Sequence, residues 1–471
     1  MSFKSLLRLC EKSLKIRGSI FLGFILGCMF TYIILPHDLS KVSQYSVLKN
    51  TDVAVNAGRK LSQANIVSSE TESGNNTKNV PLVIQQQQQQ QIQQSRLHQP
   101  HNVLPPRVAP SRLSNQQKLS SVPKYTFREF KDRVKVNSTL RDRVFSQEYL
   151  LPETTAVLRR YLLDEPYTFK YDDALKANLQ QNFDINTDVI VFLHIQKTGG
   201  MHFNDRINRE LQVPFRCKRR VTAPKSPGNC LNPSNNMWFY NTAYSGWQCG
   251  LHADWTQMHK CIPGLMDKIE QKQRPRRYFY FTQIRDAMER YLSEYHHQTA
   301  HNHWQQALLG CETLKNANDI DVIPCFRTRN WIGVSLEQFI ACKNNLATQR
   351  MTRMLADLTL AGCYKNFTDV DAIKMRAPIW LESAKRNLQS MEFIALMEDE
   401  PASDALFNKT YKLAFKRRVI TPAKKPGPGG DTMKISEEHF IRILQLAELD
   451  IHLYLFTKDL FYDRLKHIQD A

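Results

Sequence analysis

Short runs of apolar residues alternate with segments of helical spacing from residue 189 onward. The first run, Val189–Ile195, is rich in β-branched residues and shows no alternation, which is typical of a strand buried on both faces. Tyr278–Ile284 and Phe393–Leu396 read as further strands. Between them, Phe203–Leu211 repeats its apolar positions about every 3.6 residues, as a helix does. Strands that alternate with helices favour an α/β fold with a central parallel sheet flanked by helices.

The C-terminal segment Ile435–Leu465 predicts one long helix. Its apolar positions form a single stripe, made of Ile441, Leu444, Leu449, Leu453, Phe456 and Leu460. Such a stripe is more often core packing than a partner site.

The N-terminal part of the chain has a different pattern. Gly18–Pro36 has no charged residue and about the length of one bilayer-spanning helix, and five basic residues precede it. The positive-inside rule then predicts a cytosolic tail (1–17), a single-pass membrane anchor (18–36) and delivery of the rest into the secretory lumen. The alternative is a cleaved signal peptide, although the run is long for one and lacks a convincing A-x-A site.

Residues 37–122 are polar, with a Gln run at 85–91 and few aromatic side chains. Such a segment cannot bury enough surface to fold, so it predicts a disordered lumenal stem. Aromatic and charged residues return at Tyr125, and we expect one folded domain over residues 123–471.

Composition narrows the class of partner. The net charge of +19 suits a polyanion such as nucleic acid, anionic lipid or a sulfated glycan, and charge alone does not choose among them. A lumenal location removes nucleic acid from this set. The sequons at Asn75, Asn137, Asn366 and Asn408 fit lumenal exposure.

Eight of the ten cysteines follow the predicted anchor, and an even number in an oxidising compartment predicts disulfides. Their spacing does not give the pairing, although the short intervals Cys249/Cys261 and Cys311/Cys325 suggest local loops. No C-x-x-C pair occurs among the cysteines, and the histidine-rich stretch at 296–303 lacks clustered acids. We therefore expect no metal.

Gln196–Gly200 follows the first predicted strand directly and opens the first predicted helix. Glycines there allow backbone N–H groups to approach an anion, and the helix N-terminus adds positive potential. Lys197 would then touch a phosphate or phosphosulfate group. The order of residues differs from a Walker A loop, in which Lys follows the second glycine. A simple structural turn is the alternative.

Several motifs occur in one order from Val189 to the last helix, and together they resemble the heparan sulfate 6-O-sulfotransferase family. They are His194–Gly200, Cys249–Trp255, Arg290–Glu294, Arg353–Leu358, Gly362–Tyr364, Leu381–Lys385 and Lys458–Phe461. The resemblance implies a P-loop-like sulfotransferase fold, the donor 3′-phosphoadenosine 5′-phosphosulfate, and transfer to the 6-hydroxyl of glucosamine in heparan sulfate. It also implies a type II Golgi membrane enzyme.

The resemblance also implies site roles. His252 is the general base, in keeping with an ordinary pKa near physiological pH, although a buried structural histidine is the alternative. Lys197 stabilises charge on the donor, and Arg285 and Ser293 hold its 3′-phosphate. An ion pair of Arg285 with Asp286 or Glu289 is the other interpretation. Donor contacts are implied for His194, Ile195, Gln196, Lys197, Thr198, Gly199, Gly200, Met201, His202, Ile420, Thr421 and Pro422.

On the acceptor side, the resemblance implies glycan contacts from Trp247, His252, His297 and Trp304. Arg219 and Arg220 lie in a basic loop between Cys217 and Cys230, which either contacts the glycan or is simply solvated. Trp255 is interpreted as structural.

Met201 and His202 stand where the family has two threonines. Loss of these hydroxyls predicts weaker donor binding rather than loss of activity, since backbone N–H groups remain and His202 can donate a hydrogen bond. The same departure supports an alternative function, a catalytically silent heparan-binding protein. A nucleotide-sugar transferase is less favoured because no D-x-D metal site lies near the predicted strands.

Overall fold

The computed structural model describes residues 122–177, 182–218, 230–241, 247–300, 304, 307, 309–311, 331–364, 369–416 and 432–469. They belong to one compact unit, Leu113–Ala471. The predicted tail, anchor and stem lie outside the described residues, apart from Val122, and stay predictions. Within the described ranges, no helix is long and apolar enough to cross a bilayer.

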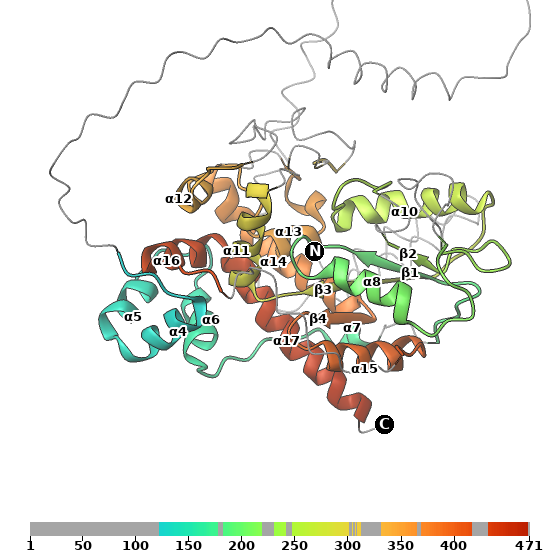
Figure 1. Cartoon of the computed structure of the whole chain (residues 1–471), viewed down its shortest axis with the longest axis horizontal. Helices are drawn as coiled ribbons and strands as arrows, with labels where there is room; N and C mark the ends of the chain where they lie inside the picture. The colour runs from blue at the N-terminus through green and yellow to red at the C-terminus, as the bar shows by residue number, and fades with distance from the viewer. Residues whose placement is uncertain are drawn as a thin grey trace, which may run out of the picture. The chain divides into compact units, whose positions relative to one another are not determined.

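Among the described residues, four strands form the centre of the fold, and helices surround them (Figure 1). The strands are β1 (Val189–Leu193), β2 (Phe239–Tyr240), β3 (Tyr278–Ile284) and β4 (Phe393–Leu396). The helices are α4 (Phe127–Val136), α5 (Ser138–Phe145), α6 (Thr154–Leu163), α7 (Asp173–Ala177), α8 (Gly200–Glu210), α10 (Trp255–Glu270), α11 (Ala287–Ala300), α12 (Leu336–Ile340), α13 (Arg350–Leu355), η5 (Leu358–Ala361), α14 (Val370–Ser390), α15 (Glu400–Tyr411), α16 (Glu437–Leu446) and α17 (Glu448–Gln469).

The strands pair in parallel in the order β2-β1-β3-β4. The predicted parallel α/β sheet is therefore confirmed, and so are its three predicted strands. β1 is shorter than predicted because the chain leaves the ladder at His194. The sequence analysis missed β2, a strand of only two residues. In a parallel sheet the carboxyl ends share one edge, so the residues after β1 and after β3 lie near each other.

The central strands are buried on both faces, as continuous apolar runs require. On one face, Phe281 stacks on Phe192 with ring centroids 4.7 Å apart and meets Phe203 of α8 at 5.9 Å. On the other face, Tyr280 stacks on His259 of α10 at 4.2 Å. The sheet is thus fixed between α8 on one side and α10 on the other.

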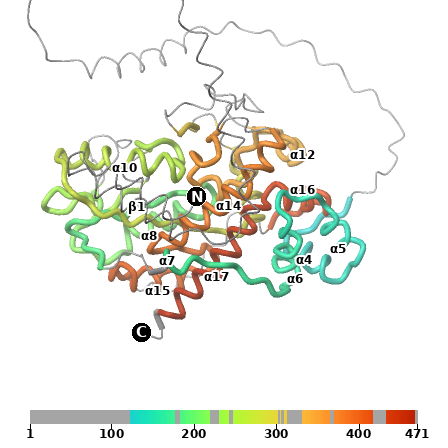
Figure 2. The backbone as a smooth tube through the Cα atoms, turned by 180° about the vertical axis from the view of Figure 1, so that it is seen from behind, coloured from blue at the N-terminus to red at the C-terminus, as the bar shows by residue number. Residues whose placement is uncertain are grey.

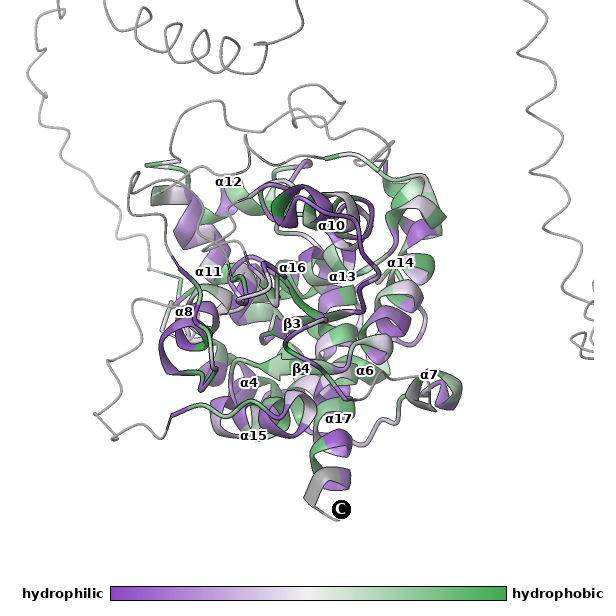
Figure 3. Cartoon of the chain, turned by 90° about the vertical axis from the view of Figure 1, so that its right-hand side faces the viewer, coloured by the Kyte–Doolittle hydropathy of each residue, from purple (hydrophilic) through white to green (hydrophobic). Residues whose placement is uncertain are grey.

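The long C-terminal helix α17 packs against many other elements of the fold. It packs against α6, α11, α13, α14, α15 and β4, and the predicted apolar stripe is buried, including Leu449, Leu453 and Phe456 at 0% exposure. Figure 3 shows green hydrophobic segments on the visible part of α17, below β4. The stripe is core packing, as predicted.

The prediction of one helix over Ile435–Leu465 is wrong, because the chain breaks at Ala447 into α16 and α17. Side chains far away in the sequence cap the new ends. The Gln349 side-chain oxygen accepts from the Leu449 backbone N–H at 2.8 Å. In return, the Asp450 carboxylate accepts from the backbone N–H groups of Met351 and Thr352 at 3.1 and 2.9 Å. Reciprocal capping satisfies the first turns of α13 and α17 and compensates for the break.

The helices α4, α5 and α6 lie beside α16, as the view from behind shows (Figure 2). Phe130 stacks on Phe440 with centroids 4.6 Å apart. Tyr125 and Ile435 exchange two backbone hydrogen bonds of 2.8 and 2.9 Å, which tie the start of the described chain to the segment before α16.

Asp450 provides a test of this arrangement. Its carboxylate is fully buried, caps α13 and lies 3.6 Å from Arg290 Nε. We expect Asp450→Ala to lower the free energy of unfolding by about 3 kcal/mol or more, because it leaves the buried N–H groups of Met351 and Thr352 without their acceptor and removes the carboxylate beside Arg290 Nε. Asp463→Ala, at an exposed position of the same helix, should change it by no more than about 0.5 kcal/mol. Denaturant unfolding of both variants checks this, and equal losses would contradict the capping role.

Candidate functional site

The turn after β1 has the strand-turn-helix geometry expected of a phosphate cradle. Lys197 and Gly199 adopt left-handed backbone conformations, with φ of 64° and 87°, and α8 begins at Gly200. The buried Thr198 hydroxyl donates to the Ile195 carbonyl oxygen at 3.0 Å and closes the turn. The helix starts three residues earlier than predicted, which places both glycines at its N-terminus.

Gly200 is required by close packing. A Cβ atom built there would lie 2.3 Å from His194 Cδ2 and 2.9 Å from Phe192 Cζ. The His194 ring stacks on Phe192 with centroids 5.5 Å apart, so it has no empty space behind it on that side. Glycine therefore allows the first turn of α8 to approach the imidazole.

The N-terminus of α8 is suited to an anion. Gly199 offers no side-chain cap, and the first turn holds no acidic residue. An 11-residue helix leaves its first N–H groups without intrahelical partners and carries partial positive charge at that end. Backbone groups thus supply the anion site independently of any side chain.

Two side chains of the turn have shifted pKa values. Burial lowers the pKa of His194 to about 4, and the Lys197 charge adds to the shift, so this imidazole is neutral at pH 7. Burial also lowers the pKa of Lys197, while the Glu294 carboxylate raises it and Arg285 lowers it further.

His252 lies directly against this turn. Its Nδ1 is 3.3 Å from the His194 carbonyl oxygen, and its own backbone is left-handed, with φ of 53°. Trp247 packs beside it with ring centroids 4.5 Å apart and is 37% exposed. The predicted base, the predicted phosphate turn and an exposed indole are therefore brought together.

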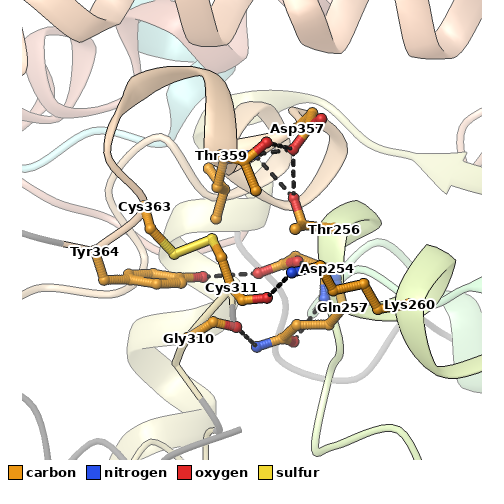
Figure 4. The surroundings of a disulfide bond; sticks show 11 residues. Asp254, Thr256, Gln257, Lys260, Gly310, Cys311, Asp357, Thr359, Cys363 and Tyr364 are labelled. Carbon is orange, nitrogen blue, oxygen red and sulfur yellow. Dashed lines mark hydrogen bonds between the residues drawn. A yellow bond between two sulfur atoms is a disulfide. The ribbon is translucent and has the colours of Figure 1, made fainter. Parts of the chain in front are cut away.

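The segment after His252 is anchored by α10 (Figure 4). Asp254 caps that helix by accepting from the Gln257 backbone N–H at 2.9 Å, and the Tyr364 hydroxyl donates to its other oxygen at 3.0 Å. Burial raises the pKa of Asp254 to about 6, against these hydrogen bonds. Figure 4 shows the disulfide Cys311–Cys363 beside this contact.

The structure confirms the prediction that the cysteines form disulfides, and it corrects one of the two suggested pairings. Cys249–Cys261 forms as its short interval suggested, and Cys217 pairs with Cys230. Cys311 does not pair with Cys325, since its partner is Cys363, 52 residues away. Cys342 also takes part in a disulfide.

Arg285 comes from the end of β3 and is 7% exposed. Its Nη1 donates to the Lys197 carbonyl oxygen at 3.3 Å, and its Nη2 forms an ion pair with Glu289 at 3.2 Å. The alternative interpretation, a Glu289 ion pair, is thus present together with a direct contact to the turn. Ser293 and His297 follow on α11 and are half-buried.

Trp304 is less suited to a glycan contact than predicted. Its ring is 5% exposed, its indole N–H donates to Glu294 at 2.9 Å, and it meets Trp331 edge-on at 4.9 Å. The contact with a glycan stays a prediction, which this burial does not favour.

The residues in the place of the family threonines point outward. Met201 is 52% exposed. His202 Nε2 lies 2.9 Å from a Glu400 carboxylate oxygen at the start of α15. His202 is therefore engaged with another helix, against the expectation that it donates to the donor phosphate.

Some predicted residues lie outside the described part of the chain, namely Arg219, Arg220, Ile420, Thr421, Pro422, Asn75 and Asn366. The other two sequons are exposed, and Asn137 also caps α5 by accepting from the Leu140 N–H at 3.0 Å. Among the described residues, no group of three or more His, Cys, Asp or Glu is placed to hold a metal.

The sequence analysis missed a buried polar chain beneath the turn. It runs from Glu294 to Arg350 and on to Gln196, the residue before Lys197. The spacing of Arg290 and Glu294, one helical turn apart, is the only signal of it in the sequence.

Comparison with known proteins agrees with this geometry. A model of the sulfotransferase family matches residues 181–457. The chain belongs to this family. It is 37% identical over 314 residues to heparan-sulfate 6-O-sulfotransferase 1-B of Danio rerio, across 65% of this chain and 75% of that protein. It is 38% identical over 289 residues to heparan-sulfate 6-O-sulfotransferase 1 of Homo sapiens, across 59% of this chain and 67% of that protein. The resemblance inferred from the motifs is confirmed.

The packing of Gly200 gives a test of the anion site in this sulfotransferase. We expect Gly200→Ala to displace the His194 ring or the first turn of α8 and to weaken binding of adenosine 3′,5′-bisphosphate roughly tenfold or more. Gly264→Ala is the matched control, because a Cβ on this α10 glycine meets nothing within 4 Å. It should leave binding unchanged. Calorimetric titration of both variants decides, and unchanged binding by Gly200→Ala would contradict the cradle.

Proposed function

We propose that the chain transfers the sulfuryl group of 3′-phosphoadenosine 5′-phosphosulfate to the 6-hydroxyl of glucosamine residues in heparan sulfate. Family membership and the names of the relatives support the reaction class and the substrate. The observation that carries the proposal for this chain is the contact between His252 and the phosphate turn, 3.3 Å from Nδ1 to the His194 carbonyl oxygen.

The residues of the turn fit the donor. The uncapped N-terminus of α8 and the left-handed turn at Lys197 and Gly199 suit a phosphosulfate, and Arg285 with Ser293 suits the 3′-phosphate. When bound, the donor supplies the sulfuryl group and leaves as the adenosine bisphosphate. Backbone N–H groups compensate for the missing threonine hydroxyls at Met201 and His202. The P-loop-like sulfotransferase fold is part of this proposal.

The base is oriented by the turn itself. A carbonyl oxygen only accepts, so the His252 Nδ1 that faces it carries the proton. In the neutral ring, Nε2 then carries the lone pair that takes the proton of the sugar hydroxyl. The neighbouring His194 is neutral at pH 7 and adds no charge that would oppose this step.

Lys197 supplies the electrostatic part of catalysis. Its ammonium group stabilises negative charge on the transferring sulfuryl group and on the leaving phosphate, as cationic clamps do in phosphoryl transfer. A half-buried position strengthens this effect, because less water screens the charge.

We assign the acceptor side to Trp247 first, because its indole is exposed next to His252 and aromatic faces pack on sugar rings. His297, Trp304, Arg219 and Arg220 stay secondary candidates. A heparan sulfate chain is the expected partner, in keeping with the net charge of +19.

We propose further that the enzyme is a type II protein of the Golgi membrane, anchored by residues 18–36 and separated from the bilayer by the stem. The disulfides support a lumenal domain, since such bonds persist in oxidising compartments. The exposed Asn137 and Asn408 fit glycosylation there.

Silent heparan binding is the competing function, favoured by the exposed Met201 and the engaged His202. Incubation of the chain with radiolabelled donor and 6-O-desulfated heparan sulfate separates the two. We expect label at the 6-position by disaccharide analysis, and His252→Ala should lower kcat roughly 100-fold or more while leaving heparan binding intact. His467→Ala, an exposed change on α17, is the control. Heparan binding without transfer would favour the silent binder.

A further inference from the structure

Glu294 is a buried carboxylate behind the phosphate turn. It lies on α11 with 0% exposure, and Arg290 donates to its Oε2. Its Oε1 accepts the Trp304 indole N–H at 2.9 Å and lies 3.3 Å from Arg350 Nη2. Burial alone would raise the pKa of Glu294, but the charges of Arg350 and Arg290 hold it below its ordinary value. The carboxylate is therefore ionised at neutral pH.

Arg350 transmits this contact to the turn. Its Nη2 also donates to the Gln196 side-chain oxygen. Gln196 is 4% exposed and immediately precedes Lys197, whose φ is 64°. A left-handed conformation at a residue other than glycine has to be held by its surroundings. Fixing Gln196 fixes the peptide from which the Lys197 side chain extends.

The charges around Lys197 come from three elements. Glu294 of α11 favours its ammonium form, whereas Arg285 at the end of β3 opposes it. His194 at the end of β1 is neutral at pH 7. Because Lys197 is half-buried, the charge of Glu294 reaches it with less screening than water would give.

We propose that Glu294 is a positioning residue for Lys197: through Arg350 and Gln196 it holds the phosphate turn from which the Lys197 side chain extends. Its negative charge also favours the ammonium form of Lys197. The inference rests on the proposed function, because it concerns the same sulfuryl transfer. In this proposal, Glu294 itself contacts neither the sulfuryl donor nor the glycan. The same carboxylate holds Trp304, so it also ties the turn to the segment predicted to meet the glycan.

Glu294→Gln removes the charge with little change of side-chain volume: the amide oxygen can still accept from Trp304, while the amide NH2 replaces the oxygen that accepts from Arg290. Removal of the negative charge should lower the pKa of Lys197, so the alkaline limb of the kcat–pH profile should move to lower pH. We expect kcat at pH 7 to fall roughly tenfold, with a smaller change in KM for the donor. The proposal is overturned if the alkaline limb stays in place.

Competitive acetylation of Lys197, followed by mass spectrometry across a pH series, measures the same protonation without turnover. Its midpoint should fall in Glu294→Gln. If the wild-type chain transfers no sulfuryl group but the midpoint shifts, the proposed function fails and the link between Glu294 and Lys197 stands. If the wild-type enzyme is active but the midpoint does not shift in Glu294→Gln, the proposed function stands and the link between Glu294 and Lys197 is overturned.

Glu270→Gln is the matched control. Glu270 is also fully buried, and it pairs with Arg274 and Arg276 at 2.8 and 2.9 Å. It lies near the amino end of β3, about 20 Å of strand away from Arg285. This variant should lose stability without any shift of the Lys197 midpoint. If the Lys197 midpoint shifted by the same amount in Glu270→Gln, removal of any buried charge would act by loosening the fold as a whole. That result would overturn the proposal.

Arg350→Lys provides a second variant in case Glu294→Gln does not fold. Lysine keeps the positive charge but lacks the rigid guanidinium whose Nη2 serves both Gln196 and Glu294. We expect a roughly tenfold lower kcat with the Lys197 midpoint near that of the wild type, since position rather than charge is lost. Unchanged kcat in a folded Arg350→Lys enzyme would exclude the link through Gln196.

Discussion

Charge buried beneath the phosphate turn has to be paired, and this constraint determines how the helices meet behind the sheet. An ion taken out of water without a partner costs several kcal/mol, so roughly that much is at stake for each group. Arg290 and Glu294 of α11, Arg350 of α13 and Asp450 of α17 satisfy one another from three helices. The same atoms cap α13 and reach the phosphate turn. Pairing of charge, rather than apolar contact alone, sets the register of these helices relative to the turn.

The central strands and the turn could be predicted from the sequence because their signals are local. Val189–Leu193 is apolar at every position, and its glycine pair follows within a few residues. Other elements carry contradictory local signals. Pro263 lies inside α10 and Pro378 inside α14, at positions that ordinarily end a helix. The break at Ala447 depends on Gln349, about a hundred residues away, so no window of sequence contains its cause.

The sequence located the residues of the turn, whose roles stay predictions, and it said less about the side chains that tertiary packing brings to them. His252 and Lys197 are gathered at one edge of the sheet, as the resemblance implied. Trp304 carries an indole, which suits either a sugar or a core, and only its burial and its bond to Glu294 distinguish the two. Gln196 gave no sign that its amide would accept from Arg350, because that contact spans 154 positions.

The net charge of +19 describes attraction to a polyanion but not the chemistry of the site. Near the turn, two arginines already have carboxylate partners, since Arg285 pairs with Glu289 and Arg350 with Glu294. If Arg285 holds the 3′-phosphate as proposed, that phosphate competes with Glu289 for Arg285, and binding there exchanges one ion pair for another. The helix N-terminus is different, because no acidic side chain occupies the first turn of α8. In the proposed function, donor affinity then depends chiefly on preorganised backbone N–H groups, and on that basis the site would tolerate Met201 and His202 in place of hydroxyl-bearing residues.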